Sequence, residues 1–280
     1  MQNLFFMQKT IELKLKGLRV EVAEVLIALL SDVGFEAFEE SEQELSAYIS
    51  ESDFNKNLVQ EILQPYVSDY ELIEIEPRNW NAEWEQQYHP VVVDQVVGIR
   101  AGFHAPLVGV ETEIVITPKM SFGTGHHATT WQMLKMMCSL SFSGKRVFDY
   151  GAGTGVLAIY AMKLGAAYVL AMDIDAWCVE NATENAAANN CAEIEILMGE
   201  KPIADQSFDF VLANINRHIL LENMNQMCTC INPGGYLLLS GFYAEENELL
   251  LDSAAACEMQ LCRSSAKNEW SCLLLQKKIS

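Results

Sequence analysis

The sequence predicts an α/β protein in which a small α+β domain precedes a larger domain built on a doubly wound, mostly parallel sheet. Two patterns predict this: an N-terminal order of elements that reads β-α-β-β-α-β, and a regular alternation of strands and helices from Lys145 onward. The chain has 280 residues, which leaves room for two domains. With 50% hydrophobic and 20% charged residues, it has the composition of a chain that is folded throughout.

The N-terminal domain is predicted to span residues 1–77 and to be ferredoxin-like. Residues 9–15 alternate as a strand does, and residues 21–33 place their apolar side chains on one helical face before Gly34. The remaining elements of this domain are two short strands, a second helix and a closing strand, at 35–39, 45–50, 57–66 and 70–76. This order is that of the split β-α-β fold, a small sheet with two helices on one face.

A short aromatic segment connects the two predicted domains. Trp80, Trp84 and Tyr88 recur at every fourth residue, which places them on one face of a helix. We predict a linker helix at residues 78–90 and interpret its aromatic face as a packing surface. Three strands then follow, at 91–93, 97–101 and 112–117.

The larger domain, residues 91–280, is predicted to contain a Rossmann-like sheet of seven strands with helices on both faces. The predicted strands are 147–150, 168–174, 194–197, 208–213, 236–240, 259–264 and 270–276. The predicted helices between them end near Leu164 and Ala188 or span 217–228 and 245–256. The last two strands are separated by a short polar turn and can form an antiparallel hairpin at the sheet edge. Ligands of such sheets bind at the carboxyl ends of the strands.

Several classes of protein and site are disfavoured. The eight cysteines lie between positions 138 and 272 and form no CxxC pair, so we interpret them as reduced core residues. The adjacent His126 and His127 lack a third ligand, so no metal site is predicted. The N-terminus lacks the basic region of a signal peptide, and no stretch approaches the ~20 apolar residues of a membrane span. We therefore expect a cytoplasmic protein with no membrane partner.

The net charge of −20 is densest at the N-terminus, where residues 1–80 hold 16 acids and 6 bases. Such a surface repels phosphate backbones and attracts a basic partner, which disfavours direct recognition of duplex nucleic acid. A solvated face without a partner is an equally good interpretation.

A glycine-rich loop in VFDYGAGTG is the main candidate for ligand binding. Gly151, Gly153 and Gly155 directly follow an apolar strand and open a helix. A dinucleotide fingerprint requires its third glycine where Val156 stands, and no Walker-type lysine follows. Asp173 ends the next strand 22 residues after Gly151, close to the ~20 expected for a carboxylate that binds ribose hydroxyls. The pattern favours S-adenosylmethionine, which carries an adenosine and an amino-acid tail but no diphosphate, over NAD.

Three other segments supply candidate polar contacts. Asp149 precedes the glycine loop and is either a second contact near the cofactor or a cap of the loop. Thr129 and Thr130 end the segment SFGTGHHATT, where they can cap the following helix and bind a ligand carboxylate. Asn214 follows the apolar strand 208–213 at its carboxyl end, where its amide can meet both the donor and an incoming amine. Asparagines at strand ends also commonly form turns.

The segments SFGTGHHATT, DYGAGTG, MDID and LANIN, in this order and spacing, resemble those of the bacterial ribosomal protein L11 methyltransferase family, and the resemblance covers nearly the whole chain. It implies a class I enzyme that uses S-adenosylmethionine and whose N-terminal domain recognises the substrate. It also implies that Thr130, Gly151, Asp173 and Asn214 bind the donor. The usual family segment is GTGTHPTT, so His126 replaces a threonine and Ala128 a proline here, and the loop should be less rigid.

The resulting functional prediction is methylation of a basic large-subunit ribosomal protein, on lysine side chains and the N-terminal amino group, as the resemblance implies. Asn214 is the candidate catalytic residue that orients the amine, and no proton acceptor is assigned. One alternative keeps the donor site but transfers the methyl group to another protein, RNA or a small-molecule amine. Another is a noncatalytic donor-binding module. A monomer is favoured.

Overall fold

The chain divides into two compact units, Met1–Tyr88 and His89–Ser280, which are described separately below. The computed structural model describes residues 9–41, 44–67, 69–76, 85, 88–119, 121–203 and 205–279. The predicted linker helix, with Trp80 and Trp84, lies mostly outside the described residues. The domain limits at 77 and 90 therefore remain predictions.

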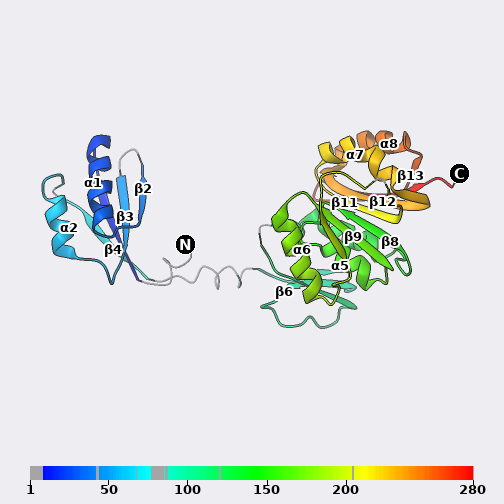
Figure 1. Cartoon of the computed structure of the whole chain (residues 1–280), viewed down its shortest axis with the longest axis horizontal. Helices are drawn as coiled ribbons and strands as arrows, with labels where there is room; N and C mark the ends of the chain where they lie inside the picture. The colour runs from blue at the N-terminus through cyan, green and yellow to red at the C-terminus, as the bar shows by residue number, and fades with distance from the viewer. Residues whose placement is uncertain are drawn as a thin grey trace. The chain divides into compact units, whose positions relative to one another are not determined.

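The small unit has the predicted β-α-β-β-α-β order (Figure 1). Its elements are β1 (Thr10–Lys16), α1 (Val20–Asp32), β2 (Ala37–Glu40), β3 (Glu44–Ser50), α2 (Lys56–Leu63) and β4 (Glu71–Ile75). The antiparallel sheet has the order β2-β3-β1-β4, which confirms the ferredoxin-like topology. Leu13 and Leu15 of β1 pack with Leu26 and Leu30 of α1 in the core.

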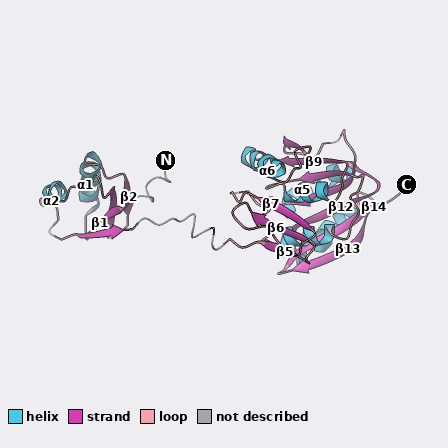
Figure 2. Ribbon diagram, turned by 90° about the horizontal axis from the view of Figure 1, so that it is seen from below, coloured by secondary structure: helices cyan, strands magenta, loops and turns pink. Residues whose placement is uncertain are grey.

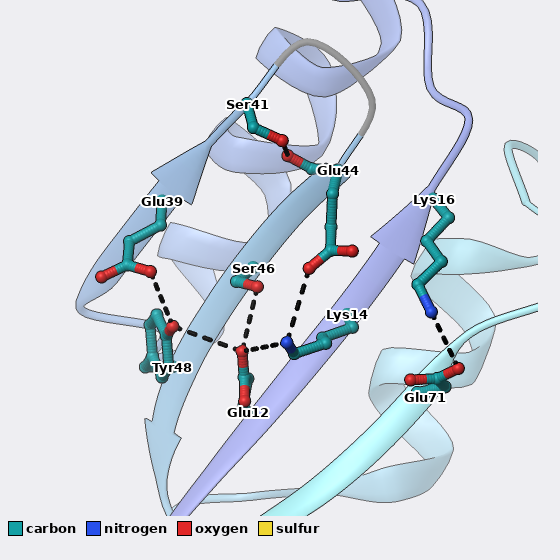
Figure 3. Close-up of polar contacts among 9 residues, drawn as sticks. All are labelled: Glu12, Lys14, Lys16, Glu39, Ser41, Glu44, Ser46, Tyr48 and Glu71. Atoms are coloured by element: carbon teal, nitrogen blue, oxygen red, sulfur yellow. Dashed lines mark hydrogen bonds and ion pairs between the residues drawn. The ribbon is translucent and has the colours of Figure 1, made fainter.

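The other face of this small sheet is polar and internally hydrogen-bonded (Figure 3). Glu12 on β1 accepts hydrogen bonds from Ser46 Oγ at 3.0 Å and Tyr48 OH at 3.3 Å, and it lies 3.3 Å from Lys14 Nζ. Burial raises the pKa of Tyr48 to about 12, so the phenol is protonated when it donates. The strand alternation of β1 thus separates an apolar face from a charged one, because successive side chains point to opposite sides.

The large unit contains the seven-stranded sheet, in the order β10-β9-β8-β11-β12-β14-β13. Strands β8 to β12 run parallel, and β14 is antiparallel to both β12 and β13, which confirms the predicted doubly wound sheet with a C-terminal hairpin. The strands are β8 (Arg146–Tyr150), β9 (Tyr168–Asp173), β10 (Glu195–Met198), β11 (Phe208–Asn214), β12 (Ile231–Tyr243), β13 (Met259–Lys267) and β14 (Trp270–Lys277). The helices are α4 (Ala128–Met137), α5 (Val156–Lys163), α6 (Ala176–Ala188), α7 (Arg217–Thr229) and α8 (Asn247–Ala255).

Helices cover both faces of this sheet, and each face has its own core. Val147 and Leu212 belong to the cluster that contains residues of α4 and α5, whereas their strand neighbours Phe148 and Val211 belong to the cluster with residues of α7 and α8. Figure 1 shows α7 and α8 together on one side of the sheet and α5 on the other. The central strands are buried on both faces, which is why their sequences are continuous apolar runs.

Three short strands before α4 form a sheet of their own. They are β5 (Val91–Val93), β6 (Val97–Ala101) and β7 (Thr112–Ile116), which lie side by side in Figure 2. Asn189, the C-cap of α6, pairs with the backbone of Val115, donating from Nδ2 at 2.7 Å and accepting at Oδ1 at 2.9 Å. Asn185 Oδ1 likewise accepts from Thr117 N at 2.8 Å. Two buried amides thus complete the edge of β7, whose backbone groups would otherwise lack partners.

Of the described helices, none is long and apolar enough to span a membrane. The eight cysteines are free, and five of them are buried.

Candidate functional site

A pocket of about 560 Å³ opens at the carboxyl ends of the parallel strands, and Gly151, Asp173 and Asn214 line it. These residues follow or end β8, β9 and β11, three strands that are adjacent in the sheet. The chain order reverses between β8 and β11, and open α/β sheets bind ligands at such a point. The volume lies within the usual range for small-molecule sites.

The glycine loop is held by its backbone on two sides. Gly151 N and Ala152 N both donate to Met172 O, at 2.8 and 2.9 Å, so the loop folds back onto β9. Thr154 N donates to Phe122 O at 2.9 Å, which ties the loop to the segment before α4. Gly153 has a φ of +56°, and a Cβ built on it would lie 2.3 Å from Phe122 O. The position therefore requires glycine for both conformation and space.

Gly155 has a packing role. It is the N-cap of α5 with a φ of +77°, and a Cβ built there would lie 3.1 Å from the Cβ of Ala182 on α6. This glycine lets the start of α5 approach α6 closely, and it is not among the residues that line the pocket.

Asp173 extends a half-buried carboxylate into the pocket wall. Its Oδ2 accepts from Gly153 N at 2.8 Å and its Oδ1 accepts from Asp175 N at 3.1 Å. A carboxylate has about four lone-pair positions, so each oxygen retains room for a further donor. The carboxylate is thus fixed by the loop and remains able to accept from ligand hydroxyls.

Asp149 lies beneath the loop rather than on the pocket wall. Its side chain is buried, and Oδ2 accepts from Ala158 N at 3.0 Å in the first turn of α5. Burial raises the pKa of Asp149 to about 7, the hydrogen bond from Ala158 lowers it, and the charge of Asp173 raises it. These contacts are those of a cap, which is one of the two roles considered for Asp149.

This buried acid predicts a pH dependence of stability. A folded-state pKa raised above the ordinary 3.8 means that stability is fully present below pH 4 and is lost as pH rises toward 7. Asp149→Asn removes this titration, so its unfolding free energy should rise relative to the wild-type chain by up to about 4 kcal/mol between pH 4 and 8. Denaturant unfolding of both proteins across this range measures the difference. Parallel profiles would show that Asp149 is not a buried titrating group.

Thr130 and Asn214 form a pair at the other end of the pocket. Asn214 Nδ2 donates to Thr130 Oγ1 at 3.2 Å. Thr130 is fully buried and supports the amide from behind, whereas Asn214 lines the pocket. Asn214 Oδ1 is buried and has no hydrogen-bond partner among the residues that the structure describes. A buried acceptor of this kind is costly unless a ligand donates to it.

The expectation that Thr129 or Thr130 caps α4 is wrong. The helix begins at Ala128, so both threonines lie inside its first turn, and the N-cap is His127. Its Nδ1 accepts from Thr129 N at 3.4 Å and lies 2.8 Å from Thr129 Oγ1. The His127 ring lines the pocket.

The charge of the pocket favours a cationic ligand. Among the described residues that line it, four are carboxylates and one is a lysine: Asp173, Asp175, Glu200, Glu222 and Lys201. Negative charge concentrated in a cleft raises the local concentration of cations. Both a sulfonium donor and an ammonium-bearing substrate fit this condition.

The family described as ribosomal protein L11 methyltransferase matches residues 16–278. The chain belongs to this family. The protein of that name from Porphyromonas gingivalis is 41% identical over 89% of both chains, and that from Chlorobaculum tepidum is 36% identical over 92% of this chain and 93% of its own. The crystal structure of a ribosomal protein L11 methylase from Lactobacillus delbrueckii subsp. bulgaricus has a TM-score of 0.64 at 28% identity, and the match covers 68% of this chain and all of that one.

Membership in the ribosomal protein L11 methyltransferase family confirms the resemblance drawn from the four motifs. It identifies the chain as an S-adenosylmethionine-dependent methyltransferase, and the family and fold imply that molecule as co-substrate.

The structure brings most of the predicted site residues together. Gly151, Gly153, Asp173 and Asn214 line one pocket, while the other three lie behind its wall: Thr130, Gly155 and Asp149. The sequence analysis missed several lining residues, namely Phe122, Ile174, Trp177, Ile219, Gly241 and Trp270. For Trp270 a signal existed, because the predicted hairpin places the first residue of an antiparallel last strand at the carboxyl edge of the sheet.

Proposed function

We propose that the chain transfers methyl groups from S-adenosylmethionine to the lysine side chains and the N-terminal amino group of ribosomal protein L11. The named relatives support this substrate, since two of them match over about nine-tenths of both chains. The observation that carries the proposal is the buried, unpartnered Oδ1 of Asn214 at the end of a pocket whose other end holds Asp173.

The residues present fit the donor. Asp173 would bind the ribose hydroxyls with the lone pairs left free by Gly153 N and Asp175 N. Gly151 and the Thr130–Asn214 pair would contact the amino-acid tail, since they lie across β8 and β11 from Asp173. Bound S-adenosylmethionine supplies an electrophilic methyl group on a positively charged sulfur. The acidic lining of the pocket favours that charge.

Asn214 would orient the acceptor. Only a neutral amine has the lone pair that attacks a methyl group, and the ordinary pKa values are about 10.4 for lysine and 7.7–8.0 for an α-amine. Oδ1 of Asn214 accepts a hydrogen bond from the amine N–H and thereby directs the lone pair toward the methyl group. Alignment of this kind supplies most of the rate, and no side chain is assigned as a proton acceptor.

No metal is assigned to this site. Among the described residues, one group of side chains has ligand atoms close enough together to hold an ion: Asp173, Asp175 and Cys178. Burial raises the pKa of the Cys178 thiol, which disfavours the thiolate that binds metals.

The small unit would recognise the substrate. Its acidic sequence suits a basic ribosomal protein, although Lys14 and Lys16 neutralise part of the charge through Glu12, Glu44 and Glu71. We propose that the reaction takes place in the cytoplasm, as a ribosomal protein substrate suggests. We assign no contact with duplex nucleic acid, and we favour a monomer.

The proposal is tested by incubating the chain with radiolabelled S-adenosylmethionine and purified ribosomal protein L11, followed by mass mapping of the product. Label is expected on amino groups of L11. Asn214→Ala should slow the transfer by about 100-fold, because the amine loses its alignment.

The matched control for this test is Asn225→Ala, which removes an exposed amide from α7 and should keep the wild-type rate. Label on RNA or a small molecule, but on no protein, would contradict the substrate. An unchanged rate for Asn214→Ala would contradict the role of its side chain.

A further inference from the structure

Five aromatic side chains line the pocket together with Asn214, and we call the three whose rings contact one another in a row the aromatic wall: Phe122, His127 and Trp270. The rings of Phe122 and His127 meet edge-on, with centroids 5.2 Å apart, and those of His127 and Trp270 do so at 4.7 Å. Tyr243 packs against Trp270 at 4.3 Å. The wall is therefore a continuous aromatic surface built on a histidine between two larger rings.

A different segment of the chain anchors each residue of the wall. The backbone of Phe122 is held by its carbonyl, which accepts from Thr154 N of the glycine loop. His127 is fixed as the N-cap of α4 by its contacts with Thr129. Trp270 opens β14, and its carbonyl accepts from Gln132 Nε2 at 3.0 Å. A surface assembled from three segments and still solvent-accessible is available to a ligand.

The order of the strands places Trp270 on the Asn214 side of the pocket, and the wall continues from there through His127 to Phe122 at the glycine loop. The ribose-binding candidate Asp173 ends β9, and Asn214 ends β11, two strands further along the sheet. Trp270 lies on β14, beyond β12 and further again from Asp173. A donor bound between Asp173 and Asn214 would thus direct its methyl group toward the side where the wall lies.

Successive methylation changes the contacts that the acceptor amine can make with this side of the pocket. In each transfer the amine lone pair forms an N–CH₃ bond, the S–CH₃ bond breaks with its electrons remaining on sulfur, and the product is an ammonium that must lose a proton to water before the next transfer. Each added methyl replaces an N–H donor, so hydrogen bonding to Asn214 and water weakens. The methylated cation gains in exchange from aromatic faces, which bind quaternary ammonium groups.

We propose that Phe122 and Trp270 hold the mono- and dimethylated forms of the target residue at the site, and so determine how many methyl groups are added. His127 is a positioning residue that sets the angle between the two rings. This inference rests on the proposed transfer to amino groups.

A binding experiment tests the wall independently of turnover. The full chain, saturated with S-adenosylhomocysteine, is titrated with Nα-acetyl-Nε-trimethyllysine amide and with its uncharged analogue in which carbon replaces the ε-nitrogen. The cation should bind about three- to tenfold more tightly, and this preference should disappear in Trp270→Leu and Phe122→Leu. Equal binding of the two probes to the wild-type chain, or a preference that persists in both variants, would overturn the proposal.

The product distribution tests the same idea in turnover. Intact-mass analysis of L11 should show fewer di- and trimethylated residues with Phe122→Leu and Trp270→Leu, a smaller change in the first transfer, and recovery with Trp270→Phe. Phe103→Leu, an exposed ring on the loop between β6 and β7, is the control. Equal slowing of all steps, or a wild-type product with a single methyl group per amine, would contradict the proposal.

Two further outcomes are distinguishable. Failure of the wild-type chain to methylate L11 contradicts the proposed function, while the binding comparison still decides the role of the wall. If Trp270→Leu does not fold, Phe122→Leu decides alone, because Phe122 is 52% exposed and belongs to neither core cluster of the large unit.

Discussion

Asp173→Ala is expected to weaken the binding of S-adenosylhomocysteine by at least about 100-fold, since hydrogen bonds to a charged group contribute about 1.5–3 kcal/mol each and two ribose hydroxyls lose theirs. The substitution also leaves Gly153 N without the acceptor that fixes the loop. Isothermal titration calorimetry measures the affinity, and thermal unfolding of the free proteins shows whether the variant is folded.

Asp175→Ala is the matched control for this result. It removes a carboxylate two residues away that also lines the pocket, whereas the contact with Asp173 is made by the backbone N–H of residue 175 and survives. Its affinity should stay within about tenfold of the wild-type value, as expected for a carboxylate that makes no direct hydrogen bond to the donor. Equal losses in the two variants would mean that the pocket responds to net charge and that Asp173 does not grip the ribose.

Gly153→Ala is expected to lower both stability and donor affinity. The left-handed φ of +56° costs an alanine about 1–2 kcal/mol, and the new Cβ would lie 2.3 Å from the carbonyl oxygen of Phe122. Because that oxygen belongs to backbone held by Thr154 N, the loop itself must move. We expect a loss of about 3 kcal/mol or more in unfolding free energy, together with the loss of measurable donor binding.

Gly144→Ala separates the cost of the left-handed φ from the cost of the clash. Gly144 has a φ of +72° and no atom within 4 Å of an added Cβ, so its replacement carries the conformational cost without the clash. This variant should lose about 1–2 kcal/mol in denaturant unfolding and retain wild-type donor affinity. If Gly153→Ala loses no more than Gly144→Ala, the contact between the loop and Phe122 is looser than described.

Local sequence patterns predicted the order of the helices and strands in both units. The predicted bounds of an element are wrong where a local signal is misleading. Strand β12 was predicted at 236–240 but spans Ile231–Tyr243. The run Asn232, Pro233, Gly234, Gly235 reads as a turn. In the folded chain Ile231 pairs with Phe208, and the register shifts before Tyr236 pairs with Phe210. Tertiary pairing overrides the turn signal here.

The sheet of β5, β6 and β7 shows a second limit of the sequence. Its strands were predicted individually, but nothing local indicates that they pair with each other or that Asn185 and Asn189 complete the edge of β7. These amides lie about 70 residues further along the chain, at separations of 68 and 74. Long-range contacts of this kind depend on how α6 packs, which periodicity does not encode.

The candidate site, too, was predicted only where its residues belong to local sequence features. Glycines and an acid at fixed spacing predicted the loop and Asp173, because a tight turn and a strand end are local features. The cap of α4 was misassigned by two or three residues, since a histidine is an uncommon N-cap and the nearby threonines are common ones. Phe122 escaped notice because its place in the site depends on a long-range contact of its carbonyl with Thr154 N, whereas the predicted hairpin already held the signal for Trp270.

The structure of a complex with S-adenosylhomocysteine tests the site assignment most directly. The account predicts ribose hydroxyls within hydrogen-bond distance of the Asp173 carboxylate, the amino-acid tail at Gly151 and the Thr130–Asn214 pair, and the sulfur facing the side of the pocket that holds Phe122 and Trp270. A ligand bound elsewhere, or a ribose that makes no contact with Asp173, would contradict it.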